Sequence, residues 1–257
     1  MTTPPTPRST ASRRGRLVGL AAGATLLAGL AAPAAATPTS VPPGGSFAES
    51  SSGAAMTLAA APACGGAKGD YQKQVKQIRS ILTKAAASSK AGKSRAAAKQ
   101  LRTVAAHVPT AHRSAAAQIG LPPTDPESDD PPGPTAIAAV FNVDHRIVTL
   151  AVPLFAKLPA RPSRALSKAL VLTVTCRVGV ARTVTALPPE GALDDYADSM
   201  ADTLPTFKQE LTAITAALGS AQLAAPGRAG LTQAQTTVKA TQKVMNKAFG
   251  GGERPTS

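Results

Sequence analysis

The chain has 257 residues and a formal net charge of +14, and 54 of its residues are alanine. Hydrophobic types make up 43% of the sequence but aromatics only 3%, so most apolar side chains are small. Each therefore contributes little, at roughly 25 cal/mol per Å² of apolar surface buried. A charged fraction of 16% is too low for a highly charged disordered polymer. The 23 prolines and 21 glycines are clustered rather than periodic, which excludes collagen.

Residues 1–36 have the features of a secretory signal peptide. Four arginines precede an apolar run that begins at Leu17, and three alanines end at Ala36, after which we predict cleavage. The alternative is an uncleaved anchor, because residues 17–36 are numerous enough to cross a bilayer. A pair of neighbouring arginines leaves the choice between Sec and twin-arginine export open.

A flexible tether is predicted for residues 37–69, which are rich in Pro, Ser, Gly and Ala and show no sustained periodicity. The chain has two cysteines, Cys64 and Cys176. Because an exported protein meets oxidising conditions, we predict a disulfide between them. Two separate buried thiols are the alternative.

Amphipathic helices are predicted over the first part of the mature chain. The first begins at Asp70, a suitable N-cap, and has apolar residues at steps of three and four. The second covers residues 93–107. Pro109 is expected to break the chain, and a short helical turn follows over residues 111–119.

The central part contains a linker and the most apolar helix of the mature chain. Residues 121–134 form an acidic, proline-rich linker, and residues 135–158 form a helix that Pro153 should kink. Residues 163–187 alternate like a strand, yet they also place apolar side chains on one helical face. No turn signal interrupts them, and a strand of that length is unusual, so we favour a helix.

Two further helices are predicted toward the C-terminus. Residues 193–218 repeat apolar side chains every seven residues, with a bend at Pro205. After a loose connector through Gly230, Thr232 and Gln235 match a capping box for the last helix. We therefore predict an all-α fold: an irregular antiparallel bundle of about five to six helices over residues 70–249, followed by a disordered tail, 250–257.

The residues offer no recognisable catalytic constellation. His107, His112 and His145 are the histidines of the chain, and they show neither zinc-ligand spacing nor a nucleophile motif. We predict a protein that is not an enzyme and has no metal site and no cofactor.

Two charged residues fall on the apolar stripes of their predicted helices. Asp144 and Arg177 are predicted to form a buried ion pair between helices, since an isolated buried charge is very costly. The alternative is a ligand pocket between residues 135–158 and 163–187, which would make the protein a carrier of small apolar ligands.

A group of carboxylates opens the helix predicted at 193–218: Asp194, Asp195, Asp198 and Asp202. Negative charge is ordinary at the first turns of a helix, so we predict a solvated face. A hydrolase would instead require these groups to converge in a cleft.

The charge distribution is the most informative feature. Residues 68–113 contain eleven Lys and Arg but one acidic residue, and the rest of the mature chain is balanced. Export makes nucleic acid an unexpected partner in vivo, and aromatic side chains for base stacking are missing from the basic segment. We predict binding to anionic cell-wall polymer or lipid head groups; the oligomeric state is left open. The predicted anion-binding residues are Lys84, Lys90, Lys93, Arg95, Lys99 and Arg102.

Overall fold

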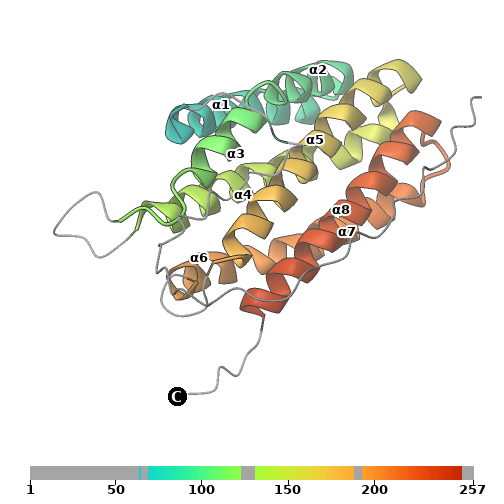
Figure 1. Cartoon of the computed structure of the whole chain (residues 1–257). Helices are drawn as coiled ribbons and strands as arrows, with labels where there is room; N and C mark the ends of the chain where they lie inside the picture. Colours follow the sequence, from blue (N-terminus) through green and yellow to red (C-terminus); the bar gives the residue numbers. More distant parts are fainter. Residues whose placement is uncertain (1–63, 65–68, 123–130, 188–192, 251–257) are drawn as a thin grey trace, which may run out of the picture. The chain divides into compact units, whose positions relative to one another are not determined.

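The structure, a computed structural model, describes Cys64 and residues 69–122, 131–187 and 193–250. The predicted signal peptide, most of the predicted tether, much of the acidic linker and nearly all of the tail lie outside the described residues. Every regular element of the described part is helical, which confirms the all-α prediction (Figure 1). The elements are α1 (Tyr71–Lys90), α2 (Ser94–Val104), α3 (Val108–Ala116), α4 (Pro132–Ala151), the 3₁₀ helix η1 (Val152–Lys157), α5 (Ala160–Thr185), η2 (Asp194–Tyr196), α6 (Ala197–Ala201), α7 (Leu204–Leu218) and α8 (Ala225–Phe249).

The ambiguous segment 163–187 is helical. It lies within α5, which runs unbroken from Ala160 to Thr185. The alternating apolar residues that resemble a strand are accommodated because α5 is covered by neighbours on several sides, including α2, α3, α4 and α8. A helix buried on more than one face does not need a single apolar stripe.

Several prolines lie in the first turns of helices, among them Pro109 and Pro205, where the sequence predicts a break and a bend. Pro109 is the second residue of α3 instead of preceding it, and Pro226 is the second residue of α8, which begins at Ala225, seven residues before the predicted cap Thr232. Pro205 lies at the start of α7, and the helix predicted at 193–218 is divided into η2, α6 and α7. Proline fits the first turn because its fixed φ is helical and its missing N–H has no intrahelical acceptor there.

The predicted capping box is wrong because α8 begins earlier in the chain than the sequence predicts. Thr232 and Gln235 lie inside α8, which already begins at Ala225. In the centre of the chain, α4 begins at Pro132, within the predicted linker 121–134, and Pro153 ends it by converting the next turn into η1.

The pair formed by α5 and α8 is held at close range by small residues. A Cβ at Gly230 would overlap the side chain of Ser167, and one at Gly227 would lie 2.9 Å from the Ser163 hydroxyl. Ser167 also donates a hydrogen bond of 2.8 Å to the carbonyl of Pro226. These contacts place the two helices side by side in the same chain direction (Figure 1), whereas α7 returns antiparallel to α8.

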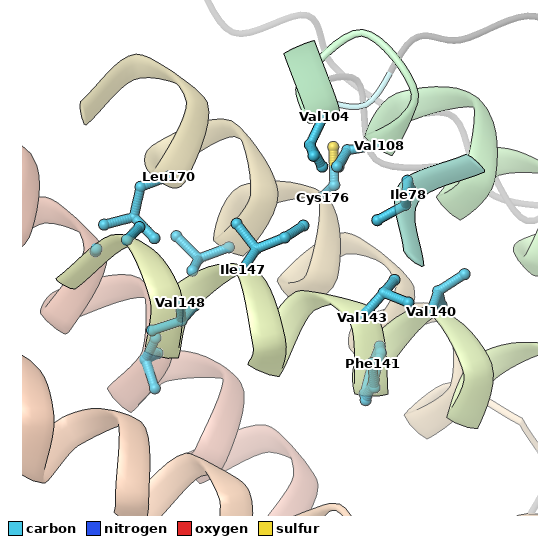
Figure 2. Close-up of a cluster of buried hydrophobic side chains, with 14 of the residues drawn as sticks. Ile78, Val104, Val108, Val140, Phe141, Val143, Ile147, Val148, Leu170 and Cys176 are labelled. Carbon is cyan, nitrogen blue, oxygen red and sulfur yellow. The ribbon is translucent and has the colours of Figure 1, made fainter. Parts of the chain in front are cut away.

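The core consists of aliphatic side chains with few rings. Figure 2 shows part of it, where side chains from α1 to α5 meet around the centre of α4. Phe141 and Phe207 form an edge-to-face pair with ring centroids 6.4 Å apart. Cys176 is fully buried in this core and forms the predicted disulfide with Cys64, with the two Cα atoms 5.1 Å apart.

By length and composition, α4 together with η1 (Pro132–Lys157) could cross a membrane. Its most apolar window is 56% buried within the helices around it. That burial is what a central core helix requires.

Candidate functional site

The first two helices form a basic hairpin, by which we mean residues 71–104. The hairpin turns at Gly92, whose φ of +72° lies in the left-handed region that favours glycine. Its two helices pack along each other (Figure 1). All the predicted anion-binding side chains that lie on it are exposed: Lys84, Lys90, Lys93, Arg95, Lys99 and Arg102.

Opposite faces of α2 separate the charged and apolar side chains. Arg95, Lys99 and Arg102 follow at steps of four and three, so they form one stripe along the helix. Leu101 and Val104 lie on the other face and are buried. Because the buried face fixes how α2 is rotated, the three cations point to solvent.

Among the described residues, the salt bridges found do not involve the cations of the hairpin. The acidic residue nearest in the chain, Asp70, caps α1 by accepting hydrogen bonds from the backbone N–H groups of Gln72 and Lys73. The positive charge of the hairpin is therefore directed at solvent.

A second set of exposed cations lies on the first half of α5: Arg161, Arg164 and Lys168. The charge count along the chain does not reveal it, because that count balances these cations against acidic residues located elsewhere. Two of those acidic residues, Asp144 and Glu210, are buried in the structure. A segment with equal numbers of acidic and basic residues can therefore still have a positively charged surface, because its acidic side chains are partly buried.

Four ionisable side chains meet inside the molecule and form what we call the buried charge cluster: His112, Asp144, Arg177 and Glu210. The Nε2 of His112 lies 2.8 Å from Oδ2 of Asp144. The two terminal nitrogens of Arg177 donate to the two carboxylate oxygens of Glu210 at 2.7 and 2.6 Å. The Arg177 guanidinium carbon also lies 4.9 Å from the centre of the Phe207 ring.

The predicted direct pair between Asp144 and Arg177 is corrected by these contacts. Both side chains are buried and paired, but not with each other: Asp144 pairs with His112 of α3, and Arg177 pairs with Glu210 of α7. The two remain electrostatically coupled, since each favours the charged form of the other. Sequence reasoning overlooked Glu210, although it lies three residues after Phe207 and four before Ile214, on the buried stripe of α7.

The surroundings of His112 favour its protonated form. Burial lowers its pKa, but the Asp144 carboxylate and the carbonyl of Val108, 2.9 Å from Nδ1, outweigh that effect and raise the pKa above its ordinary value. Burial raises the pKa of Asp144, although His112 and Arg177 oppose it. Both shifts act alike: the folded pair holds protons to higher pH than the same side chains in an unfolded chain.

Glu210 is held in its charged form. Burial raises its pKa, but Arg177 and the Nδ1 of His145, 3.1 Å from Oε1, outweigh burial and lower the pKa below its ordinary value. The third histidine, His107, pairs its Nδ1 with the side-chain oxygen of Gln74 at 3.0 Å. The histidines thus have structural partners, and the described residues contain no group of three or more His, Cys, Asp or Glu arranged to hold a metal ion.

The acidic residues in and next to η2 and α6 that the structure describes face solvent. Asp195, Asp198 and Asp202 are exposed, and none of them lines a hollow described for the structure. The side chain of Asp194 lies outside the described part. For the three described carboxylates, the arrangement matches the predicted solvated face.

Among the described residues, none of the cavities found is lined by side chains of both α4 and α5, where the carrier alternative places its pocket. Next to the buried charge cluster, the space bordered by His112 and the disulfide measures about 20 Å³, which holds little more than one water. Larger open hollows lie along α8, one against α5 and one against α7. Buried hydrophobic side chains of both α4 and α5 belong to the core, and Asp144 and Arg177 are each paired with a side chain of a third helix.

Three comparisons with known proteins bear on the identity of the chain. No protein-family model, no curated protein and no solved structure matches it.

Proposed function

We propose that this protein is an exported, non-enzymatic helical bundle that binds anionic material of the cell envelope through its basic hairpin. The observation that carries the proposal is the hairpin itself: it has nine exposed cations, among them all six predicted anion-binding residues, while Asp70, the carboxylate nearest in the chain, is engaged as a helix cap. Exposed like charges repel one another, so they contribute little to folding. A dense set of phosphate groups would relieve that repulsion.

Export rests on the leader-like residues 1–36 and is compatible with the disulfide between Cys64 and Cys176. Stable disulfides are rare in the reducing cytoplasm. Cleavage after Ala36 releases the mature chain in this proposal. N-terminal sequencing of the exported protein tests it, and a mature chain that begins at another residue would contradict it.

Binding is tested by co-sedimentation with vesicles of phosphatidylglycerol and phosphatidylcholine and, in a separate arm, with isolated cell walls. The test variant replaces Lys93, Arg95, Lys99 and Arg102 with Gln. The matched control removes the same number of charges from exposed positions of α7 and α8, with Lys208, Lys239, Lys243 and Lys247 replaced by Gln. The two arms identify whether lipid or wall polymer supplies the anionic groups.

The expected result is a loss of binding in the hairpin variant, nearly full binding in the control, and weakening of both as salt rises. An equal loss in the two variants would show that net charge alone is responsible. That outcome, or binding that neither variant changes, would refute a hairpin-specific role.

A further inference from the structure

An open groove runs between α5 and α8, on helices that do not belong to the basic hairpin. Its volume is about 580 Å³, within the range of about 300–1,000 Å³ that small-molecule sites occupy. Val171 and Leu172 of α5 line it, together with Pro226 and Ala229 of α8. Most of the surface that the groove presents is therefore apolar.

Two cations border the same groove. Arg164 and Lys168 both line it, and because they are four residues apart they lie on one face of α5. Both are exposed, and the described residues that line the groove include no carboxylate. Two positive side chains therefore lie beside an apolar groove. A ligand with complementary chemistry has one anionic group and an apolar body.

The walls of the groove are firmly placed. Gly230 permits α8 to lie against Ser167 of α5, and the hydroxyl of Ser167 bonds to the Pro226 carbonyl across the two helices. Because these contacts fix the spacing of α5 and α8, the groove is formed before a ligand binds. A preformed site loses less binding free energy to ordering.

We propose that the groove binds a single-chain anionic amphiphile of the fatty-acid class. The acyl chain lies along Val171, Leu172 and Ala229, and the carboxylate lies beside Arg164 and Lys168. The inference goes beyond the proposed function, since the residues that carry it are separate from those of the basic hairpin. Either proposal can fail while the other holds.

The experiment titrates the full, disulfide-bonded chain with cis-parinaric acid, whose fluorescence rises in an apolar site, and with its uncharged methyl ester. Ala229→Phe fills the groove at an exposed position, and Arg164→Gln with Lys168→Gln removes the cations. Ala91→Phe and Arg182→Gln are the controls, because both positions are exposed and neither lines the groove. Sedimentation velocity of each variant reports the oligomeric state.

We expect saturable binding of the acid, weakened about tenfold or more by each groove variant and unchanged by the controls. We also expect the ester to bind more weakly than the acid. The proposal is overturned by a lack of saturable binding, by equal affinity for acid and ester, or by binding that Ala229→Phe leaves unchanged. A dimer that Ala229→Phe dissociates would likewise overturn it, because the groove would then be covered by a second copy of the chain.

Discussion

The basic hairpin and the buried charge cluster use charged side chains in opposite ways. In the hairpin, cations such as Arg95 and Lys99 face water, and the described residues offer them no ion-pair partner. In the cluster, Arg177 and Glu210 are fully buried and bond to each other through two hydrogen bonds. Charges of the first kind can be changed with little effect on folding, whereas those of the second kind depend on their partners.

The largest effect is expected at Glu210. Replacing it with Ala leaves the Arg177 guanidinium buried without its carboxylate, which should lower the free energy of unfolding by about 3–5 kcal/mol. Urea unfolding followed by circular dichroism measures the change. Asp198→Asn is the control, since Asp198 is exposed and should change stability by less than about 0.5 kcal/mol. Similar small changes in both variants would remove the distinction between the two regions.

The disulfide comes next. It joins residues 112 apart in sequence, and Cys64→Ser should lower stability by about 2–4 kcal/mol by releasing that constraint on the unfolded chain. Urea unfolding of the variant and of the oxidised wild type gives the difference. The variant keeps Cys176 as a small buried side chain. If wild-type stability were the same with and without a reducing agent, the bond would contribute nothing.

The pH dependence of stability tests His112. Its pKa is raised in the folded protein by Asp144, so the stabilisation is fully present below the unfolded value of about 6.5 and is lost as pH rises through the folded value. Urea unfolding of the wild type should show stability falling between pH 6 and pH 9, a range that begins below the unfolded pKa of about 6.5. His112→Gln should be less stable at pH 6 and flatter across this range. A wild-type curve that rises instead would show that the folded histidine is neutral.

The smallest effect is expected in the hairpin. Replacing Lys93, Arg95, Lys99 and Arg102 with Gln should change the free energy of unfolding by less than about 0.5 kcal/mol per site, because all four side chains are exposed. Thermal unfolding at low and high salt measures this change. A gain in stability that disappears in salt would sharpen the comparison, since it would measure the repulsion among these cations. A large loss would mean that they have a structural role.

The helical class and much of the core could be predicted from apolar spacing. Val75, Ile78 and Leu82 are buried at the predicted steps of α1, and Asp70 caps it as expected. The disulfide followed from the presence of two cysteines in a chain with an apparent leader. These features depend on local pattern or on elimination, which a sequence displays directly.

The ion-pair partners of the buried charges and the first residues of the helices could not be predicted as well from the sequence. Asp144 and Arg177 were recognised as buried charges, but which carboxylate reaches Arg177 depends on how α7 crosses α5, and no local pattern encodes that crossing. Pro109 was predicted to break the chain because proline disrupts a helix interior, and the residues around Pro226 were predicted to be a loose connector. The structure places both in first turns, where the same chemistry favours the helix.

One exposed proline has an effect at a distance. Pro205 lies in the first turn of α7, where its ring prevents α6 from continuing straight into the next helix. The axis that α7 then follows carries Glu210 to Arg177. We expect Pro205→Ala to allow a longer continuous helix from α6 through α7, and that helix would follow a different axis. The exposed Pro205 ring thus helps to determine where the buried Glu210 carboxylate lies.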